Sequence, residues 1–344
     1  MHFFIGSYTH MLTPTFGGRG DGIYVVHIDE QGTVELVHTV PTENPAYLAI
    51  SDDNRFLYTI TEKEQDAVVK AFTIHADFSL SFLNQELIPG SLPCHLVYCN
   101  GHIVVACYGS GNVLHYQTQA DGKIMPHASH HIHTGKGVNA SRQEAPHAHQ
   151  AVLHPDQKTL FVPDLGIDTV KVYELGSSYL QPKPDLDITT VAGGGVRHLV
   201  FNKAGTLGYL SHELTGQVSV LEQQNLNWEV VELHESLPAS YAGTPIASAI
   251  RLHPNERFLY AANRGYDGIT VFEVQANSLQ LKHHFKTHGE ELREFNITPD
   301  GRFLIACHQI SDQIMTFKIQ EDGSCELISQ TDSLISPVCV CFLK

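Results

Sequence analysis

The chain has 344 residues, of which 42% are hydrophobic and 17% are charged, and its formal net charge is −16 at neutral pH. This balance is typical of a folded globular protein and excludes a disordered chain. The negative charge makes nucleic acids and anionic membranes poor partners. No apolar run is long enough to predict a membrane span. An anionic small molecule stays open as a partner, provided that basic residues gather at one place.

The N-terminal stretch MHFFIGSYTH has no basic region and only a short apolar run, so we expect no signal peptide. The seven cysteines are scattered and form no CxxC pair. An odd number of cysteines without a secretion signal indicates reduced, mostly buried thiols and a cytoplasmic protein.

One unit of sequence recurs along the whole chain. Each unit has an apolar strand, a turn rich in Asp, Asn or Gly, and an aromatic-rich strand. Six full copies are found at 44–62, 92–109, 146–166, 195–213, 246–264 and 291–309. A third strand such as GITVFEV and a less regular fourth strand follow each copy, and no long amphipathic helix is evident.

The seventh copy is split between the two ends of the chain. SPVCVCFLK at the C-terminus resembles the first strand of a unit, HFFIGSYT at the N-terminus the second, and DGIYVVHI the third. Pairing of the two ends would close a ring and leave no sheet edge exposed. The sequence therefore predicts an all-β protein, a seven-bladed β-propeller with four antiparallel strands per blade, as a single domain over residues 1–344.

Two positions of the repeat are expected to lie at one mouth of the central channel. The first strand and the second run antiparallel, so the start of one and the end of the other share a face of the disc. The starts of the first strands are Ala46, Cys94, His149, Arg197, Ser248, Arg293 and Val338. The ends of the second strands are Thr9, Glu62, Gly109, Gly166, Glu213, Arg264 and Gln309.

These ring positions hold three arginines, although the whole chain has only 21 Lys and Arg residues. A charged residue at a channel mouth must be hydrated, paired with an opposite charge, or engaged in binding or catalysis. The cluster is the local basic site that an anionic substrate would need on an acidic protein. Arginines and glutamates that simply pair and hold the blades together are the structural alternative.

The stretch EAPHAHQAVLHP at 144–155 places His147 and His149 two residues apart, so on an extended segment their side chains share a face. That spacing suits a metal, a catalytic base or a structural role. No third ligand follows at a matched spacing, so we expect no metal. His154 is expected to point into a turn and to be inert, and the tract at 126–133 to be a solvated outer strand.

The chain resembles the seven-bladed propeller lactonases, which include the propeller-type 6-phosphogluconolactonases and the fungal carboxy-cis,cis-muconate lactonising enzymes. The resemblance covers essentially the whole chain and is strongest in GVNASRQEAPHAHQAVLHPDQKTLFVPDLGIDTVKVYEL, VRHLVFNKAGTLGYLSHEL, FLYAANRGYDGITVF and LREFNITPDGRFL. It implies that the family's catalytic and binding positions fall on His149, Arg197, His198, Glu213, Arg264, Arg293 and Asn296. Val196 and His212 depart from the family's usual Pro and Asn.

The resemblance implies hydrolysis of 6-phosphogluconolactone to 6-phosphogluconate, a step of the pentose phosphate pathway. We expect His149 to be the general base, with Glu213 orienting it or the water, or acting as the base itself. Arg197 and Arg264 suit the oxyanion, a carboxylate or the phosphate. Arg293, Asn296, His147, His198 and Gln309 are the expected substrate-binding residues, and His147 is alternatively expected to support the base from behind. No cofactor is expected, and the protein is expected to be a monomer or a weak homo-oligomer.

Two alternatives stay open. One is another enzyme of the same class, either a muconate-type cycloisomerase or a hydrolase of a different sugar lactone. The other is a binding propeller like the WD-repeat scaffolds, which carry Trp-Asp and Gly-His signatures in every blade. The single tryptophan, Trp228, argues against the scaffold.

Overall fold

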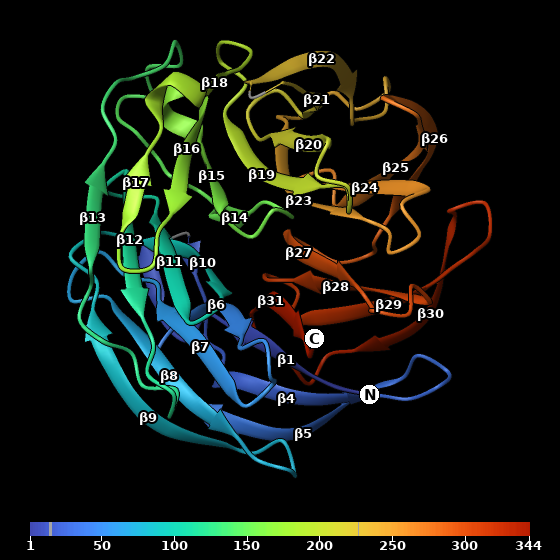
Figure 1. The fold of residues 1–344 in the computed structure, drawn as a ribbon. Coiled ribbons are helices and arrows are strands. Elements are labelled where there is room, and N and C mark those ends of the chain that lie inside the picture. Colours follow the sequence, from blue (N-terminus) through green and yellow to red (C-terminus); the bar gives the residue numbers. More distant parts are fainter. Residues whose placement is uncertain (14–15, 226) are drawn as a thin grey trace.

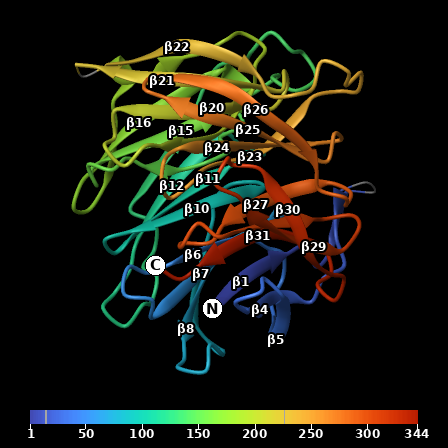
Figure 2. The same cartoon turned by 90° about the vertical axis from the view of Figure 1, so that its right-hand side faces the viewer.

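The structure is a computed structural model that describes residues 1–13, 16–225 and 227–344. Seven β-sheets stand around a common centre in a ring (Figure 1), which confirms the predicted seven-bladed propeller. Figure 2 shows the same ring turned by 90°.

Six of the blades are built from strands that follow one another in the chain, with the first strand innermost and the last at the rim. The first three of these blades contain β6 (Pro45–Ile50), β7 (Phe56–Thr61), β8 (Val68–Ile74) and β9 (Leu80–Leu87); β10 (Pro93–Cys99), β11 (His102–Cys107), β12 (Asn112–Gln117) and β13 (Ser129–Ile132); and β14 (Val152–Leu153), β15 (Thr159–Asp164), β16 (Thr169–Leu175), β17 (Leu180–Pro182) and the extra β18 (Ile188–Thr189). The next three contain β19 (Val196–Phe201), β20 (Leu207–His212), β21 (Gln217–Gln224) and β22 (Asn227–Glu235); β23 (Ile246–Leu252), β24 (Phe258–Arg264), β25 (Gly268–Gln275) and β26 (Ser278–Lys286); and β27 (Leu292–Ile297), β28 (Phe303–His308), β29 (Gln313–Ile319) and β30 (Cys325–Thr331).

The seventh blade closes the ring with strands from both ends of the chain. Its strands from the centre outward are β31 (Pro337–Phe342), β1 (His2–Ser7), β4 (Gly22–Ile28) and β5 (Val34–Pro41). β31 pairs antiparallel with β1, with Phe3 opposite Phe342 and Ile5 opposite Val340. Both termini therefore lie in one blade (Figures 1 and 2), as the split repeat predicts.

The core lies between neighbouring blades. The second strand of a blade is covered on both faces, so its residues form a continuous buried run rather than an alternating one. All six residues of β7, FLYTIT, are buried, and Tyr58 and Ile60 pack with Val105 of the next blade. This double burial explains why the aromatic-rich half of each repeat is the clearest signal in the sequence.

A β-bulge interrupts the inner strand of six blades near its start. The register shifts at Gly6/Ser7 opposite β31, Pro45/Leu48, Pro93/His95, Val196/Leu199, Ala247/Ile250 and Leu292/Glu294. A bulge leaves a residue unpaired and re-aims its side chain. The predicted ring residues of the first strands, such as Cys94, Arg197 and Arg293, fall at these bulges. In the blade of β14, the corresponding segment makes only an isolated bridge between Ala148 and Asp164.

Short elements complete the fold. The hairpin of β2 (Met11–Thr13) and β3 (Phe16–Gly17) leaves the seventh blade between β1 and β4. Two single-turn 3-10 helices, η1 (Leu165–Ile167) and η2 (Pro184–Leu186), lie in the blade of β14. Over the described part of the chain, no helix has the length and apolar character needed to cross a membrane.

The tract at 126–133 was expected to be a solvated outer strand. Ser129–Ile132 do form the outermost strand β13, with alternating exposure. His133 is the exception, because it is buried between Asp164 and Tyr173. Its Nδ1 lies 2.6 Å from Asp164 Oδ2 and its Nε2 lies 2.7 Å from Tyr173 Oη. The expectation was wrong for His133, which ties the outer strand to the middle of the next blade.

Replacing Ile5 with alanine should weaken ring closure. Ile5 is fully buried and contacts strands from both ends of the chain, so we expect a loss of about 2–5 kcal/mol in the free energy of unfolding. The exposed Leu36 on the outer strand is a matched control, expected to change it by no more than about 0.5 kcal/mol as Leu36→Ala. Denaturant unfolding measures both, and equal losses would contradict the closure account.

Candidate functional site

A cavity of about 290 Å³ opens at one mouth of the channel. We call it the site cavity. It is lined by Thr13, Phe16, Glu62, Leu92, Cys94, Tyr108, Arg142, His149, Glu213, Arg264 and Arg293. Residues from both predicted rings line it together, as expected from the antiparallel course of the two inner strands.

Glu213 is the hub of this cavity. The residue follows β20 directly and is buried. Its Oε2 lies 3.1 Å from Arg197 Nε and 2.9 Å from Arg264 Nη2. Its Oε1 lies 2.5 Å from Arg142 Nη2. One carboxylate therefore holds three guanidinium groups from three different segments of the chain.

The electrostatics of the hub keep Glu213 ionised. Burial alone would raise the pKa of its carboxyl group, but Arg264 and Arg197, helped by His149 and Arg142, bring that pKa well below the ordinary value. Burial and the neighbouring Arg264 lower the pKa of Arg197 to about 10, which still leaves Arg197 charged at neutral pH. A carboxylate held this way is a weak base and a strong anchor for cations.

His149 lies beside the hub with its ring buried. Its Nε2 lies 4.0 Å from Glu213 Oε2, and its Nδ1 lies 3.9 Å from Cys94 Sγ. Burial, followed by the charge of Arg197, lowers the pKa of His149 well below the ordinary value. The imidazole is therefore neutral at neutral pH and has an unprotonated ring nitrogen that can accept a proton.

A second polar cluster lies at the cavity, with residues from the sixth, seventh and first blades. Arg293 Nη2 donates to Tyr8 Oη at 2.9 Å, and Tyr8 Oη donates to Glu62 Oε2 at 2.7 Å. The Arg293 guanidinium also lies over the Phe16 ring, 5.0 Å from its centroid. Burial raises the pKa of Glu62, while Arg293 opposes that rise. This cluster contrasts with the hub, because Glu62 accepts a hydrogen bond from a neutral hydroxyl, whereas three guanidinium groups lie against Glu213.

Arg142 and Tyr108 are cavity residues that the sequence reasoning missed. Arg142 lies on the segment between β13 and β14, which belongs to no repeat, and its side chain is 39% exposed at the cavity rim. Its neighbour Gln143 donates from Nε2 to Asp168 Oδ1 at 2.7 Å and to the carbonyl of Leu165, which fixes the segment. Tyr108 precedes the predicted ring position Gly109 by one residue. The segment GVNASRQEAPHAHQ, singled out by the family resemblance, was the available signal for Arg142.

Four predicted residues surround the cavity without lining it. Arg197 and His198 lie deeper in the channel, where Arg197 Nη1 is 3.3 Å from His198 Nε2. His147 stacks behind Tyr108, with ring centroids 4.4 Å apart, and its Nδ1 is 2.8 Å from the Tyr108 carbonyl oxygen. Gln309 donates from Nε2 to the Gly17 carbonyl at 2.8 Å and so holds the hairpin of β2 and β3. These positions suit residues that support the cavity wall, which is one of the two roles expected for His147; the substrate contacts expected for His147, His198 and Gln309 stay predictions.

Asn296 does not join the site cavity, contrary to the sequence expectation. It lies three residues after Arg293 along β27, about 10 Å further down the channel at the usual rise of a strand. There it lines a separate cavity of about 670 Å³ with His95, Gln150 and Arg251. Its Nδ2 donates to the carbonyl of Val340 and its Oδ1 accepts from the amide of Ile297, so its contacts are structural. A substrate contact of Asn296 in the site cavity does not fit this position.

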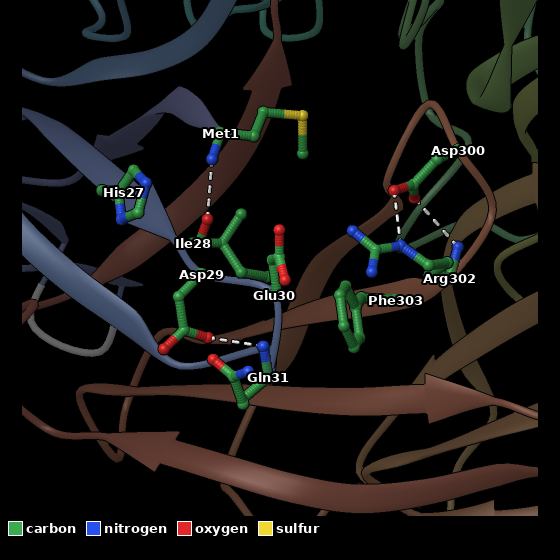
Figure 3. Close-up of a pocket in the computed structure, with 9 residues that line it drawn as sticks. All are labelled: Met1, His27, Ile28, Asp29, Glu30, Gln31, Asp300, Arg302 and Phe303. Atoms are coloured by element: carbon green, nitrogen blue, oxygen red, sulfur yellow. Dashed lines mark hydrogen bonds and ion pairs between the residues drawn. The ribbon is translucent and has the colours of Figure 1, made fainter.

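A third hollow lies away from both cavities, between the seventh blade and the turn after β27 (Figure 3). Three of its charged groups have local partners. The N-terminal amino group donates to the Ile28 carbonyl, the Asp29 carboxylate accepts from the Gln31 amide, and Arg302 pairs with Asp300. It contains none of the predicted ring residues.

The donor set of the site cavity is unsuited to a cation. Across residues 1–13, 16–225 and 227–344, no group of three or more His, Cys, Asp or Glu side chains is placed to hold a metal ion. In the cavity itself, guanidinium groups lie against the Glu213 carboxylate and the Tyr8 hydroxyl donates to Glu62, so a metal would have to displace these partners from the same oxygens.

A family model described as Lactonase, 7-bladed beta-propeller matches residues 2–342. The chain belongs to this family. A 6-phosphogluconolactonase of Bacillus subtilis is 32% identical to it over 350 residues, which cover 99% of this chain and 97% of the relative.

Solved structures show the same architecture. A Bacteroides fragilis protein provisionally named a 6-phosphogluconolactonase superposes with a TM-score of 0.92 at 27% identity, covering 100% of this chain and 98% of the other. The periplasmic gluconolactonase of Pseudomonas aeruginosa superposes with a TM-score of 0.91 at 27% identity, covering 100% and 99%.

Glu213→Gln should destabilise the protein in a pH-dependent way. Removing the carboxylate leaves three guanidinium groups without their shared partner, so we expect the free energy of unfolding at neutral pH to fall by about 3–5 kcal/mol. Because the folded-state pKa of Glu213 is lowered, its contribution is complete above the ordinary value of 4.5 and is lost as the pH falls through the lower folded-state pKa.

Denaturant unfolding over a pH series measures this difference. Glu229→Gln, a change of an exposed glutamate on the outer strand β22, is the matched control and should have little effect. A difference in the free energy of unfolding between wild type and Glu213→Gln that grows on acidification would contradict the role of the ionised Glu213 carboxylate as the shared partner of three arginines.

Proposed function

We propose that the protein is a lactone hydrolase whose substrate is 6-phosphogluconolactone, which it opens to 6-phosphogluconate. The observation that carries the proposal is a cavity with three guanidinium groups on its wall, a fourth just beneath it, and a neutral buried imidazole beside them. Positive charge suits a phosphorylated sugar acid, and the imidazole suits activation of water. The similarity to the Bacillus subtilis 6-phosphogluconolactonase supports the choice of substrate.

In this proposal His149 takes a proton from the water that attacks the lactone carbonyl. Glu213 is a poor candidate for that role, because three guanidinium groups lower its basicity. Its task is to hold Arg264 and Arg142 on the cavity wall. A guanidinium held in this way can donate to the oxyanion that develops on the carbonyl oxygen without reorganising during the reaction.

Two arginines are available for the phosphate. Arg142 stands at the partly exposed rim, where the far end of an elongated substrate would lie. Arg293 lies deeper and is held by Tyr8 and Phe16. If the phosphate lies at the rim, the lactone ring lies beside His149. We therefore propose both Arg142 and Arg293 as ligands of the phosphate.

We place the protein in the cytoplasm and its reaction in the pentose phosphate pathway. All seven cysteines lie in the described part of the chain and are free thiols, which supports a reducing compartment. Catalysis without a metal or cofactor, and a monomer or weak homo-oligomer, complete the proposal. Unphosphorylated gluconolactone is the second candidate substrate, favoured by the similarity to the Pseudomonas aeruginosa gluconolactonase.

His149→Gln should lower kcat for 6-phosphogluconolactone by a factor of about 10²–10⁴, the range expected for loss of a general base. A coupled assay on freshly generated lactone, with EDTA present and spontaneous opening subtracted, measures the rate. Because the pKa of His149 is lowered from its ordinary value of 6.5, the acid-side fall of the wild-type rate should lie below pH 6.5.

The matched control for this variant is His154→Gln. His154 is also buried, but its Nε2 binds the Gly205 carbonyl outside the cavity, so its loss should leave kcat unchanged. A wild-type protein that opens the lactone no faster than the spontaneous reaction would contradict the proposed function.

Arg142→Ala and Arg293→Ala should impair the phosphorylated lactone selectively. A charge-assisted hydrogen bond contributes about 1.5–3 kcal/mol, so kcat/KM for 6-phosphogluconolactone should fall about 10- to 100-fold more than that for gluconolactone. Arg302→Ala, which removes a surface arginine from the hollow in Figure 3, should change neither value. Equal losses on both substrates would remove phosphate recognition from these arginines.

A further inference from the structure

Two glutamates line the site cavity in opposite electrostatic environments. Glu213 follows β20 and Glu62 follows β7, three blades apart around the ring. Three guanidinium groups lie against Glu213. Glu62 instead accepts a hydrogen bond from the neutral Tyr8 hydroxyl and is almost fully buried. Pairs of carboxyl groups whose environments favour different protonation states divide the roles of acid and base in many active sites.

The hydrogen bonds around Glu62 define which oxygen would carry a proton. Arg293 can only donate, so Tyr8 Oη accepts from it and sends its own proton to Glu62 Oε2. Oε2 is therefore an acceptor, and the acidic proton of a neutral Glu62 belongs on Oε1. The backbone is fixed as well, because the Glu62 amide donates to the Asn44 carbonyl and Asn44 Nδ2 donates to the Glu62 carbonyl.

We propose that Glu62 is the proton donor to the ring oxygen that departs when the lactone opens, and that Tyr8 is its positioning residue. The inference rests on the proposed lactonase function and goes beyond it by assigning the second proton transfer. An alkoxide is a poor leaving group, so expulsion of the ring oxygen needs a proton at the moment the bond breaks.

Two side chains, His149 and Glu62, account for the proton transfers of the reaction. The water oxygen bonds to the carbonyl carbon while His149 takes a water proton. The bond between that carbon and the ring oxygen then breaks, and the ring oxygen keeps the electron pair and takes the proton from Glu62 Oε1. The product hydroxy acid ionises; of its carboxyl proton and the proton on His149, one returns to Glu62 and the other leaves to solvent.

Other groups in the cavity are less suited to this role. Burial raises the pKa of the Cys94 thiol strongly, and it likewise raises the pKa of Tyr108, so both hold their protons tightly at neutral pH. Arg142, Arg264 and Arg293 do not give up a proton in the working range. Glu62 is the carboxyl group on the cavity wall whose pKa is raised rather than lowered, by burial first of all.

The test compares leaving groups. Glu62→Gln should lower kcat for 6-phosphogluconolactone about 100-fold, within the range for loss of a general acid. It should leave turnover of the p-nitrophenyl ester of 6-phosphogluconate largely unchanged, because nitrophenolate departs without a proton. The fall of kcat on the alkaline side of the pH profile should also disappear in this variant. Tyr8→Phe should show a smaller loss with the same dependence on leaving group.

The controls distinguish a failure of the role of Glu62 from a failure of the proposed lactonase function. Glu43→Gln changes a partly exposed glutamate of the same blade that pairs with Lys63, and it should leave both rates unchanged. Calorimetric binding of 6-phosphogluconate to Glu62→Gln checks that the cavity is intact. Equal losses on both substrates, or none on the lactone, would overturn the role of Glu62 while wild-type turnover leaves the lactonase standing. A wild-type protein inactive on the lactone would overturn both.

Discussion

The carboxylate of Glu213 organises the site, because it brings together side chains that are remote in the chain. Arg142, Arg197 and Arg264 come from three segments, and each contacts this one group. Without the carboxylate, like charges would meet in a buried space and repel. The same contact explains two further properties of the cavity: Glu213 has little basicity to offer, and His149 stays neutral beside a cluster of cations.

The propeller supplies the geometry that this interaction needs. Six inner strands carry a β-bulge near the same mouth, and each bulge re-aims a side chain at the channel. A ring of equivalent positions can therefore hold different residues in different blades. Arg142, Arg197, Arg264 and His149 gather around Glu213, while Glu62, Tyr8 and Arg293 occupy another part of the ring. A symmetrical scaffold thus carries an asymmetric site with distinct places for a base and an acid.

Features that recur from blade to blade could be predicted from the sequence, and features that occur in one blade alone could not. Blade number, ring closure and the shared mouth of Glu213, Arg264 and Arg293 followed from copies of one unit, whose second strands are buried on both faces. Arg142 was not predicted as a site residue because its segment between β13 and β14 has no counterpart in other blades. The position of Asn296 away from the site cavity was not foreseen, because the family motif carries no information on depth along β27. The sequence left two roles open for His147, and it could not show that its segment makes a single bridge at Ala148 and is not a regular strand.

The central claim is that the mouth holding Glu213 binds a sugar acid with its carboxyl end inside and its phosphate at the rim. A crystal structure of the protein soaked with 6-phosphogluconate tests this most directly. The account predicts the carboxylate within hydrogen-bond distance of His149 and Arg264, and the phosphate beside Arg142. Ligand bound instead in the cavity of Asn296, or with its phosphate buried against His149, would contradict it.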